Sequence, residues 1–140
     1  MTASKYNSEG YYDPTTYEAL SRIEREERAA RYRPLVYICS PYSHGCINTN
    51  IENARKYSRF AVDRHYLPIT PHIYFTQFMD DTVFEERETA IFMNLVLMSK
   101  CVELWVFGDT ISAGMKAEIE RAERKHMKIR YFTEELEEKE

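Results

Sequence analysis

The chain has 140 residues, of which 44% are hydrophobic and 30% are charged, and this is enough for one domain with a buried core. Its formal net charge of −4 argues against duplex nucleic acid as the main partner, because the phosphate backbone attracts basic surfaces. No apolar run approaches the length that spans a membrane, and residues 1–10 lack the apolar stretch of a signal peptide. We therefore expect a cytoplasmic protein without a membrane partner.

The three cysteines, Cys39, Cys46 and Cys101, are odd in number and do not follow a metal-binding spacing. Free thiols in a reducing compartment are the simplest interpretation. The four histidines also lack metal spacing, so we expect no metal site.

Three parts are expected along the chain: an extension of residues 1–33, a domain of residues 34–132, and an acidic tail of residues 133–140. Asp13 followed by Pro14 is typical of a helix start and predicts a charged helix that ends near Arg31. The tail reads EELEEKE over residues 134–140 and is interpreted as a solvated, frayed end.

Short apolar runs alternate with stretches of helical periodicity in the middle part of the chain. The strands are expected at residues 34–39, 66–70, 103–107 and 127–132, and the helices at about residues 50–65, 85–100 and 113–125. Apolar strands that alternate with helices predict a parallel sheet covered on both faces. The predicted fold class is α/β, a Rossmann-like three-layer sandwich with a mostly parallel sheet of four to five strands.

The helix expected at residues 85–100 is unusually apolar. Residues 90–98 read AIFMNLVLM, which leaves Asn94 as the one polar residue. A helix that is apolar on every side is buried on every side. In a domain of this size, we expect one side of this helix to pack on another subunit of a homo-oligomer.

Ligands of parallel sheets bind beyond the carboxyl ends of the strands, where the loops at residues 40–48 and 108–112 are expected to meet. Ser112 begins a helix there, and its free N–H groups are suited to an anion. Glu118 follows in the second turn, and Gly114 leaves open space above it. Two ordinary alternatives stay open: Ser112 is an N-cap only, and Glu118 is a surface acid on a charged helix.

Helical periodicity places the sheet-facing side of this helix at Met115, Ile119, Ala122 and His126. Tyr42 in the first loop is either a packing residue or a site residue. The same two alternatives apply to His72 beside the second strand. The four glycines cannot form GxGxxG, and no P-loop motif is present. The sequence therefore argues against dinucleotide cofactors and P-loop triphosphatases, and we expect no cofactor.

The order of five motifs resembles the nucleoside 2-deoxyribosyltransferase-like superfamily, in particular its bacterial and phage members. The motifs are VYICSPY, NIENARKYSRFAV, PITPHIYF, ELWVFG and SAGMKAEIERA, within residues 34–132. The resemblance implies cleavage or transfer at the N-glycosidic bond of a nucleoside or nucleoside 5′-monophosphate. It also implies a homo-oligomer in which neighbouring subunits help to close the site.

The resemblance assigns roles to individual residues. It implies that Glu118, four residues after Gly114, attacks C1′ and forms a glycosyl-enzyme. Tyr42 helps to place this nucleophile, and Ser112 and Gly114 hold a 5′-phosphate. The remaining candidate substrate contacts are Ser40, Ser43, His72 and Asp109.

Two positions depart from the family pattern. Asn94 stands where the family has an Asp that protonates or orients the base, and an amide cannot act as an acid. Val102 stands at a second family Asp, for which Asp80 or Asp81 in the preceding loop is a possible substitute. The alternative function is therefore a non-catalytic nucleotide-binding protein of the same fold.

Overall fold

The computed structural model describes residues 14–140, which divide into two compact units at the boundary between Arg33 and Pro34. In the first unit, helix α1 spans Pro14–Ala30, as the sequence predicts, whereas the proposed cap Asp13 lies outside the described residues. The apolar side chains Leu20 and Ile23 of α1 are exposed. None of the helices in the described part of the chain is long and apolar enough to cross a membrane.

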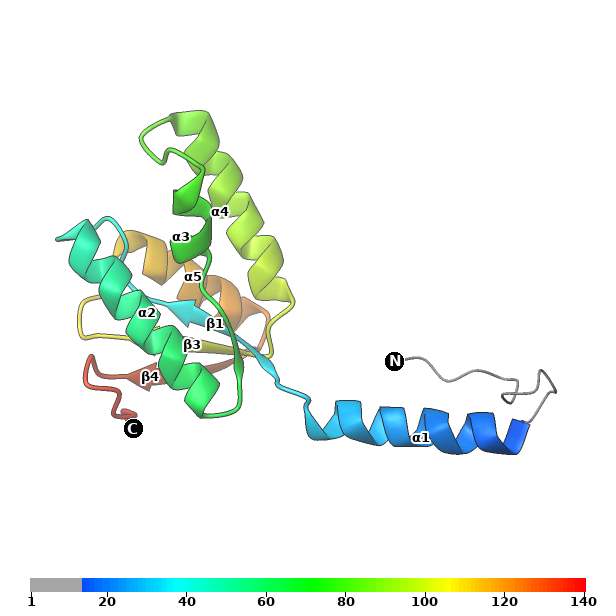
Figure 1. Ribbon diagram of the computed structural model, residues 1–140. Coiled ribbons are helices and arrows are strands. Elements are labelled where there is room, and N and C mark those ends of the chain that lie inside the picture. The colour runs from blue at the N-terminus through cyan, green and yellow to red at the C-terminus, as the bar shows by residue number, and fades with distance from the viewer. Residues whose placement is uncertain (1–13) are drawn as a thin grey trace. The chain divides into compact units, whose positions relative to one another are not determined.

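The second unit contains one parallel sheet with the order β2-β1-β3-β4 (Figure 1). Its strands are β1 (Leu35–Cys39), β2 (Leu67–Ile69), β3 (Glu103–Phe107) and β4 (Lys128–Phe132). Its helices are α2 (Ile47–Asp63), α3 (Pro71–Tyr74), α4 (Phe84–Ser99) and α5 (Ala113–Arg124), with the 3-10 helix η1 (Phe75–Gln77). The expected four-strand β-α alternation is confirmed, and the residues after β2 form short helical turns.

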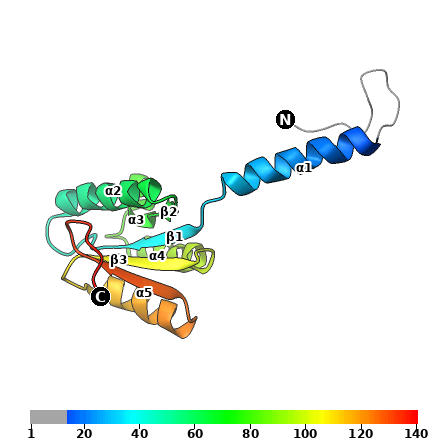
Figure 2. The same ribbon diagram turned by 90° about the horizontal axis from the view of Figure 1, so that it is seen from below.

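Helices cover both faces of the sheet, with α2 on one side and α5 on the other (Figure 2). Successive side chains of a strand point to opposite faces, so β1 contributes to two cores. The first core lies between α2 and the sheet and consists of Val36, Ile38, Tyr57, Ala61, Trp105, Phe107 and Phe132. The second lies beneath α4 and α5 and includes Tyr37, Cys39, Met98, Leu104, Val106, Met115, Ile119 and Ala122. This is the predicted three-layer sandwich.

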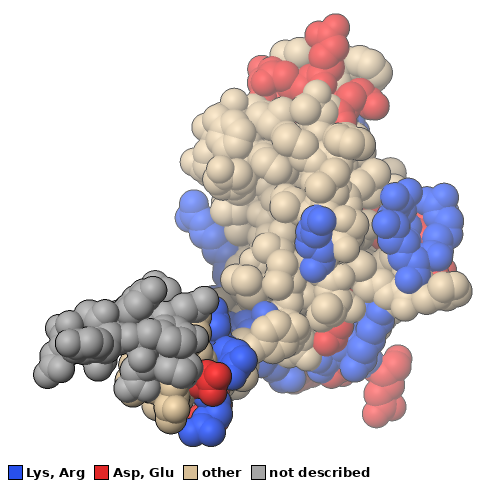
Figure 3. Space-filling view, turned by 90° about the vertical axis from the view of Figure 1, so that its right-hand side faces the viewer, with Lys and Arg blue, Asp and Glu red and all other residues tan. Residues whose placement is uncertain are grey.

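Two details of the helices differ from the predictions. His126 does not face the sheet, because α5 ends at Arg124 and His126 lies exposed in the following turn with φ of 57°. Helix α4 is not buried on every side by its own chain, since Met98 is its one buried residue whereas Phe92 is 67% exposed. The sheet and the neighbouring helices cover a single side of α4, which leaves a wide uncharged area on its outer face (Figure 3).

Residues 133–140 are ordered, in contrast to the frayed end that their charge predicts. They turn back along β4, where Glu138 forms an antiparallel bridge with Phe132 and the Lys139 amide donates to the Tyr131 carbonyl at 2.7 Å. Leu136 packs against the core beneath α2, and the Arg130 guanidinium binds both carboxylate oxygens of Glu138 at 2.8 and 2.7 Å. One apolar anchor and a bidentate ion pair therefore outweigh the repulsion among the acidic side chains.

Candidate active site at the carboxyl edge of the sheet

The strand order places a topological switch point between β1 and β3. The chain leaves β1 through α2 toward β2, and leaves β3 through α5 toward β4, so the two loops diverge over opposite faces of the sheet. Ligands of open α/β sheets bind at such a point. Asn50 of α2 orders the first loop, because its side-chain amide donates to the carbonyls of Tyr42 at 2.7 Å and His44 at 2.8 Å.

The start of α5 is a well-formed cap with open space beside it. Ser112 has extended backbone angles, and its hydroxyl accepts a hydrogen bond from the Met115 amide at 3.3 Å. A Cβ at Gly114 would meet nothing within 4 Å, so the first turn of the helix is accessible. Gly108, with φ of 94°, provides the left-handed turn that directs the chain from β3 toward this cap.

Glu118 is not the solvated surface acid of the ordinary alternative. It is half-buried, and its carboxylate lies beneath α5 against β1, where Cys39 Sγ donates to Oε1 at 3.8 Å. Burial raises the pKa of Glu118 to about 7, while side-chain hydrogen bonds from Tyr37 and Cys39 partly oppose that rise in pKa. A carboxyl group that titrates near neutrality suits a catalytic role better than a structural one.

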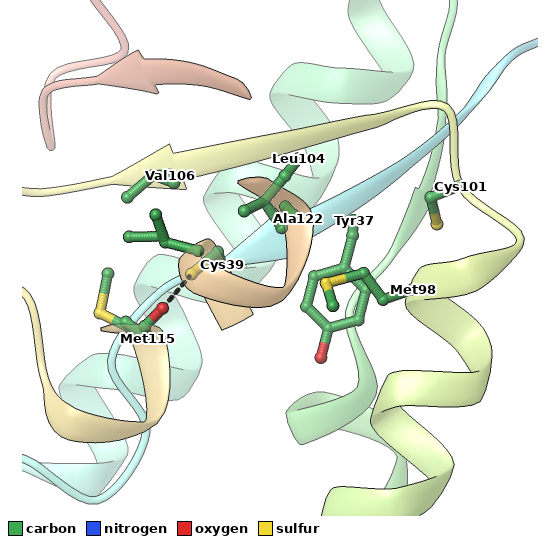
Figure 4. Close-up of a cluster of buried hydrophobic side chains, with 9 residues drawn as sticks. Tyr37, Cys39, Met98, Cys101, Leu104, Val106, Met115 and Ala122 are labelled. Carbon is green, nitrogen blue, oxygen red and sulfur yellow. Dashed lines mark hydrogen bonds between the residues drawn. The ribbon is translucent and has the colours of Figure 1, made fainter. Parts of the chain in front are cut away.

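Tyr37 and Cys39 are the two buried β1 side chains that face α4 and α5, since they lie two residues apart on one strand (Figure 4). Tyr37 is 2% exposed, and Cys39 Sγ also approaches the Met115 carbonyl at 3.9 Å. Burial is the larger cause, and the charge of Glu118 the next, that raises the pKa of the Tyr37 hydroxyl and of the Cys39 thiol well above their ordinary values. Both groups therefore stay protonated and act as hydrogen-bond donors to the carboxylate.

The predicted site residues do not include Tyr37 and Cys39, because the apolar run at residues 34–39 predicts the interior of a strand. The signal was present in the period of the strand. Their polar tips alternate with the fully apolar Val36 and Ile38, so they share one face of the sheet. Glu118 borders the sheet-facing side of α5, so the two patterns place all three side chains at the same layer of the fold, whereas the register between α5 and β1 that joins them comes from the tertiary structure.

A second polar group forms where β1 and β2 end. Ser40 Oγ lies 3.2 Å from His72 Nε2, and the Tyr42 ring approaches the His72 ring edge-on with centroids 6.1 Å apart. Burial lowers the pKa of His72 to about 4, so its imidazole is neutral at pH 7. Burial and the charge of Asp81 raise the pKa of Tyr42, which a hydrogen bond to Thr76 partly opposes. The structure thus brings together three of the candidate residues, Ser40, Tyr42 and His72.

The other candidates are placed differently. Ser43 is exposed in its loop, and Asp109 has an 86% exposed side chain that pairs with Lys139 at 2.8 Å. Asn94 lies on α4, and its buried Oδ1 has no hydrogen-bond partner within residues 14–140. The carboxylate of Asp80 accepts hydrogen bonds from the backbone amide and the hydroxyl of Thr82 at 3.0 and 2.6 Å, so its hydrogen-bond partners lie within its own turn.

An open depression lies elsewhere, along α2, β2 and α3. Its lining residues are Arg55, Ser58, Pro68, Thr70, Ile73, Tyr74 and Gln77. It contains no carboxyl group, so the buried acid Glu118 marks the better candidate site. Among residues 14–140, no group of three or more His, Cys, Asp and Glu side chains is arranged to hold a metal ion.

The three-layer sandwich matches the fold of a nucleoside deoxyribosyltransferase. A solved structure of a 2-deoxyribosyltransferase from the psychrotolerant bacterium Bacillus psychrosaccharolyticus is similar, with a TM-score of 0.59 and 15% sequence identity. The match covers 71% of this chain and 72% of that chain, and at this identity it shows the fold alone.

The chain belongs to the family described as "Domain of unknown function (DUF7768)", whose model matches residues 34–132. These residues are the same ones that carry the resemblance seen in the sequence. A search of curated proteins finds no match.

Proposed function

We propose that this protein cleaves or transfers at the N-glycosidic bond of nucleosides or nucleoside 5′-monophosphates, with Glu118 as the nucleophile. The observation that carries the proposal is the half-buried carboxylate of Glu118, in the second turn after the capped start of α5. Tyr37 and Cys39 of β1 donate hydrogen bonds to this carboxylate. The fold resemblance to a 2-deoxyribosyltransferase supports the same substrate class.

In the proposed reaction, the ionised carboxylate of Glu118 forms a bond to C1′ of the sugar. The C1′–N bond breaks, and its electron pair leaves with the base, which takes up a proton from solvent water. Water or a second base then attacks C1′, gives up a proton to solvent and releases the carboxylate, so the configuration at C1′ is retained. Tyr37 and Cys39 orient the carboxylate, and their protonated state prevents either from competing as the nucleophile.

The start of α5 is the proposed site of the 5′-phosphate. Its backbone N–H groups and the partial positive charge of the helix end favour an anion, and the absence of a side chain at Gly114 leaves room for it. Binding energy gained at the phosphate would position C1′ over Glu118. Ser40, Tyr42 and neutral His72 provide uncharged hydrogen-bonding and stacking groups for the sugar or base.

The direct test is base release. The purified protein is incubated with a panel of deoxyribo- and ribonucleosides and their 5′-monophosphates, and free base is separated by chromatography. We expect release from at least one member of the panel, and addition of a second base distinguishes transfer from hydrolysis. A folded protein that releases no base from any member would contradict the catalytic proposal.

A non-catalytic nucleotide-binding protein is the second candidate function. The specific observation in its favour is Asn94, whose side chain offers no acid for the departing base. This candidate predicts that a nucleotide raises the unfolding temperature of the protein without any base release.

We also propose that the outer face of α4 binds a second copy of the chain. Residues 89–99 carry no charge, and the exposed apolar side chains on α4 include Phe84, Ile91, Phe92 and Val96. Glu85 and Glu86 lie in the first turn of α4, and Lys100 caps its end. Two antiparallel copies of α4 would therefore join apolar centres and oppositely charged ends.

The substitution Phe92→Glu tests this interface. It places a charge at the centre of the apolar face, so we expect the mass in solution, measured by light scattering, to fall to that of one chain. Leu67→Glu is the matched control, because it also replaces an exposed apolar residue by Glu, on β2 and away from α4, and it should leave the assembly intact. A wild-type protein that is already a single chain would refute the interface.

A further inference from the structure

Residues 133–140, called here the return segment, reach beyond β4 to the loop that precedes α5. Within the segment, the Thr133 amide donates to the Glu137 carbonyl at 2.8 Å, and the Leu136 amide donates to the Thr133 carbonyl at 3.0 Å. This turn brings Lys139 back beside the end of β3. The segment is therefore a built element rather than a chain that happens to lie against the surface.

Lys139 contacts the loop at residues 108–112 twice. Its Nζ donates to the Gly108 carbonyl at 3.1 Å and lies 2.8 Å from Asp109 Oδ1. The Gly108 amide in turn donates to the Phe132 carbonyl at 3.0 Å, so the first residue of the loop is held on both of its peptide groups. The loop continues directly to Ser112, the cap of α5.

The rest of the return segment supports this position. Glu134 Cγ lies 3.8 Å from the place that a Cβ at Gly108 would occupy, so Glu134 also packs beside the turn that Lys139 contacts. The charges of Glu134 and Glu135, after burial, contribute to raising the pKa of Tyr57 to about 12, which places the segment close to α2. The segment thus contacts structure around the end of β3 and is anchored at Leu136 and Glu138.

We propose that Lys139 is a positioning residue for the candidate site, and that it holds the loop at residues 108–112 in the shape that presents Ser112 and the start of α5. This inference rests on the proposed function for its consequence in substrate binding. Its structural part, the control of loop order by one side chain, stands without that function.

Charge gives Lys139 a second effect on the same loop. Asp109 lies three residues before Ser112, so its unpaired carboxylate would repel a phosphate at the start of α5. The ammonium group of Lys139 neutralises that carboxylate. Loss of Lys139 therefore both loosens the loop and leaves a negative charge near the proposed anion site.

Amide hydrogen exchange of the full chain tests the structural part. Lys139→Met removes both loop contacts and should accelerate exchange at Gly108 and Met115 by about tenfold. Asp109→Asn keeps the contact to the Gly108 carbonyl and should have a smaller effect, and Lys139→Arg should restore rates close to wild type. Lys125→Met, with the same charge change at the far end of α5, is the control. Equal exchange in wild type and Lys139→Met would overturn the proposal.

Calorimetry with deoxyadenosine 5′-monophosphate and with deoxyadenosine tests the consequence for binding. Lys139→Met should weaken binding of the monophosphate by about three- to tenfold and leave binding of the nucleoside unchanged. The double variant Lys139→Met/Asp109→Asn should recover part of the loss, because it also removes the repelling charge. Equal weakening for both ligands, or no recovery, would overturn the electrostatic effect of Lys139. If these two ligands do not bind the wild-type protein, the comparison is made with the nucleoside and 5′-monophosphate of the panel that do bind. If no member of the panel binds, the proposed function fails, whereas the exchange result still decides whether Lys139 orders the loop.

Discussion

Replacing Glu118 by Gln is expected to reduce base release by a factor of about 1,000 or more, because the amide keeps the shape of the side chain but cannot form the glycosyl-enzyme. The measurement is single-turnover release of free base from the best substrate of the panel. Binding of that substrate should persist, since the start of α5 and the group around His72 are unchanged. Loss of turnover with retained binding would identify Glu118 as the nucleophile.

The same variant carries its own control for folding. The pKa of Glu118 is raised from its ordinary value of 4.5 to about 7 in the folded protein, so its favourable effect on stability is complete below pH 4.5 and is lost as the pH rises through 7. Glu118→Gln should therefore be more stable than wild type at pH 8, by on the order of 2 kcal/mol, and closer to wild type at pH 5. Unfolding in urea at the two pH values measures this difference. Full base release by a folded Glu118→Gln protein would exclude the proposed chemistry.

Base release by the wild-type protein is expected to rise with pH and level off above a midpoint near 7. The nucleophile is the ionised carboxylate, and burial holds the pKa of Glu118 at about 7, so below the midpoint the rate should fall about tenfold per pH unit. The Tyr37 hydroxyl lowers this pKa by its hydrogen bond. Tyr37→Phe should therefore move the midpoint upward by about one pH unit and reduce the plateau rate, because the carboxylate also loses its orientation.

Tyr57→Phe is the matched control for this experiment. Tyr57 is as buried as Tyr37, at 1% exposed, but it belongs to α2 on the opposite face of the sheet, where it stacks on Phe107 with ring centroids 4.2 Å apart. Its replacement removes a hydroxyl from the opposite face of the sheet and should leave the midpoint where it is. A midpoint that Tyr37→Phe does not move would show that the hydroxyl has no part in setting the ionisation of Glu118.

The helical wheel of α5 illustrates how far a sequence pattern carries. It placed Met115, Ile119 and Ala122 against the sheet, and all three are buried there. It placed Glu118 at the margin of that side and left open whether the carboxylate faces solvent or protein. Whether the carboxylate faces solvent or protein depends on the register between α5 and β1, since a shift of one residue would exchange the two environments. The periodicity of each element does not encode that register.

The second loop and the return segment illustrate the opposite case. Asp109 is one of the predicted substrate contacts, and the structure pairs its carboxylate with Lys139, 30 residues further along the chain. The charges of residues 134–140 predicted a frayed end, but the composition of a short segment does not record which partners it meets. Arg130, the apolar core against which Leu136 packs, and the Gly108 carbonyl supply those partners from three other places.

Local patterns in the amino-acid sequence were sufficient for the βαβ alternation, the parallel sheet and the capped start of α5, because each depends on residues close together in the chain. The tertiary structure alone decided the environment of Glu118, the pairing of Ser40 with His72, and the attachment of residues 133–140 to the loop before α5. These features join residues from separate elements, and the distances between such residues are set by packing of the helices on the sheet. The pKa of a carboxylate follows from those distances and from its burial, so it becomes readable once the layers are assembled.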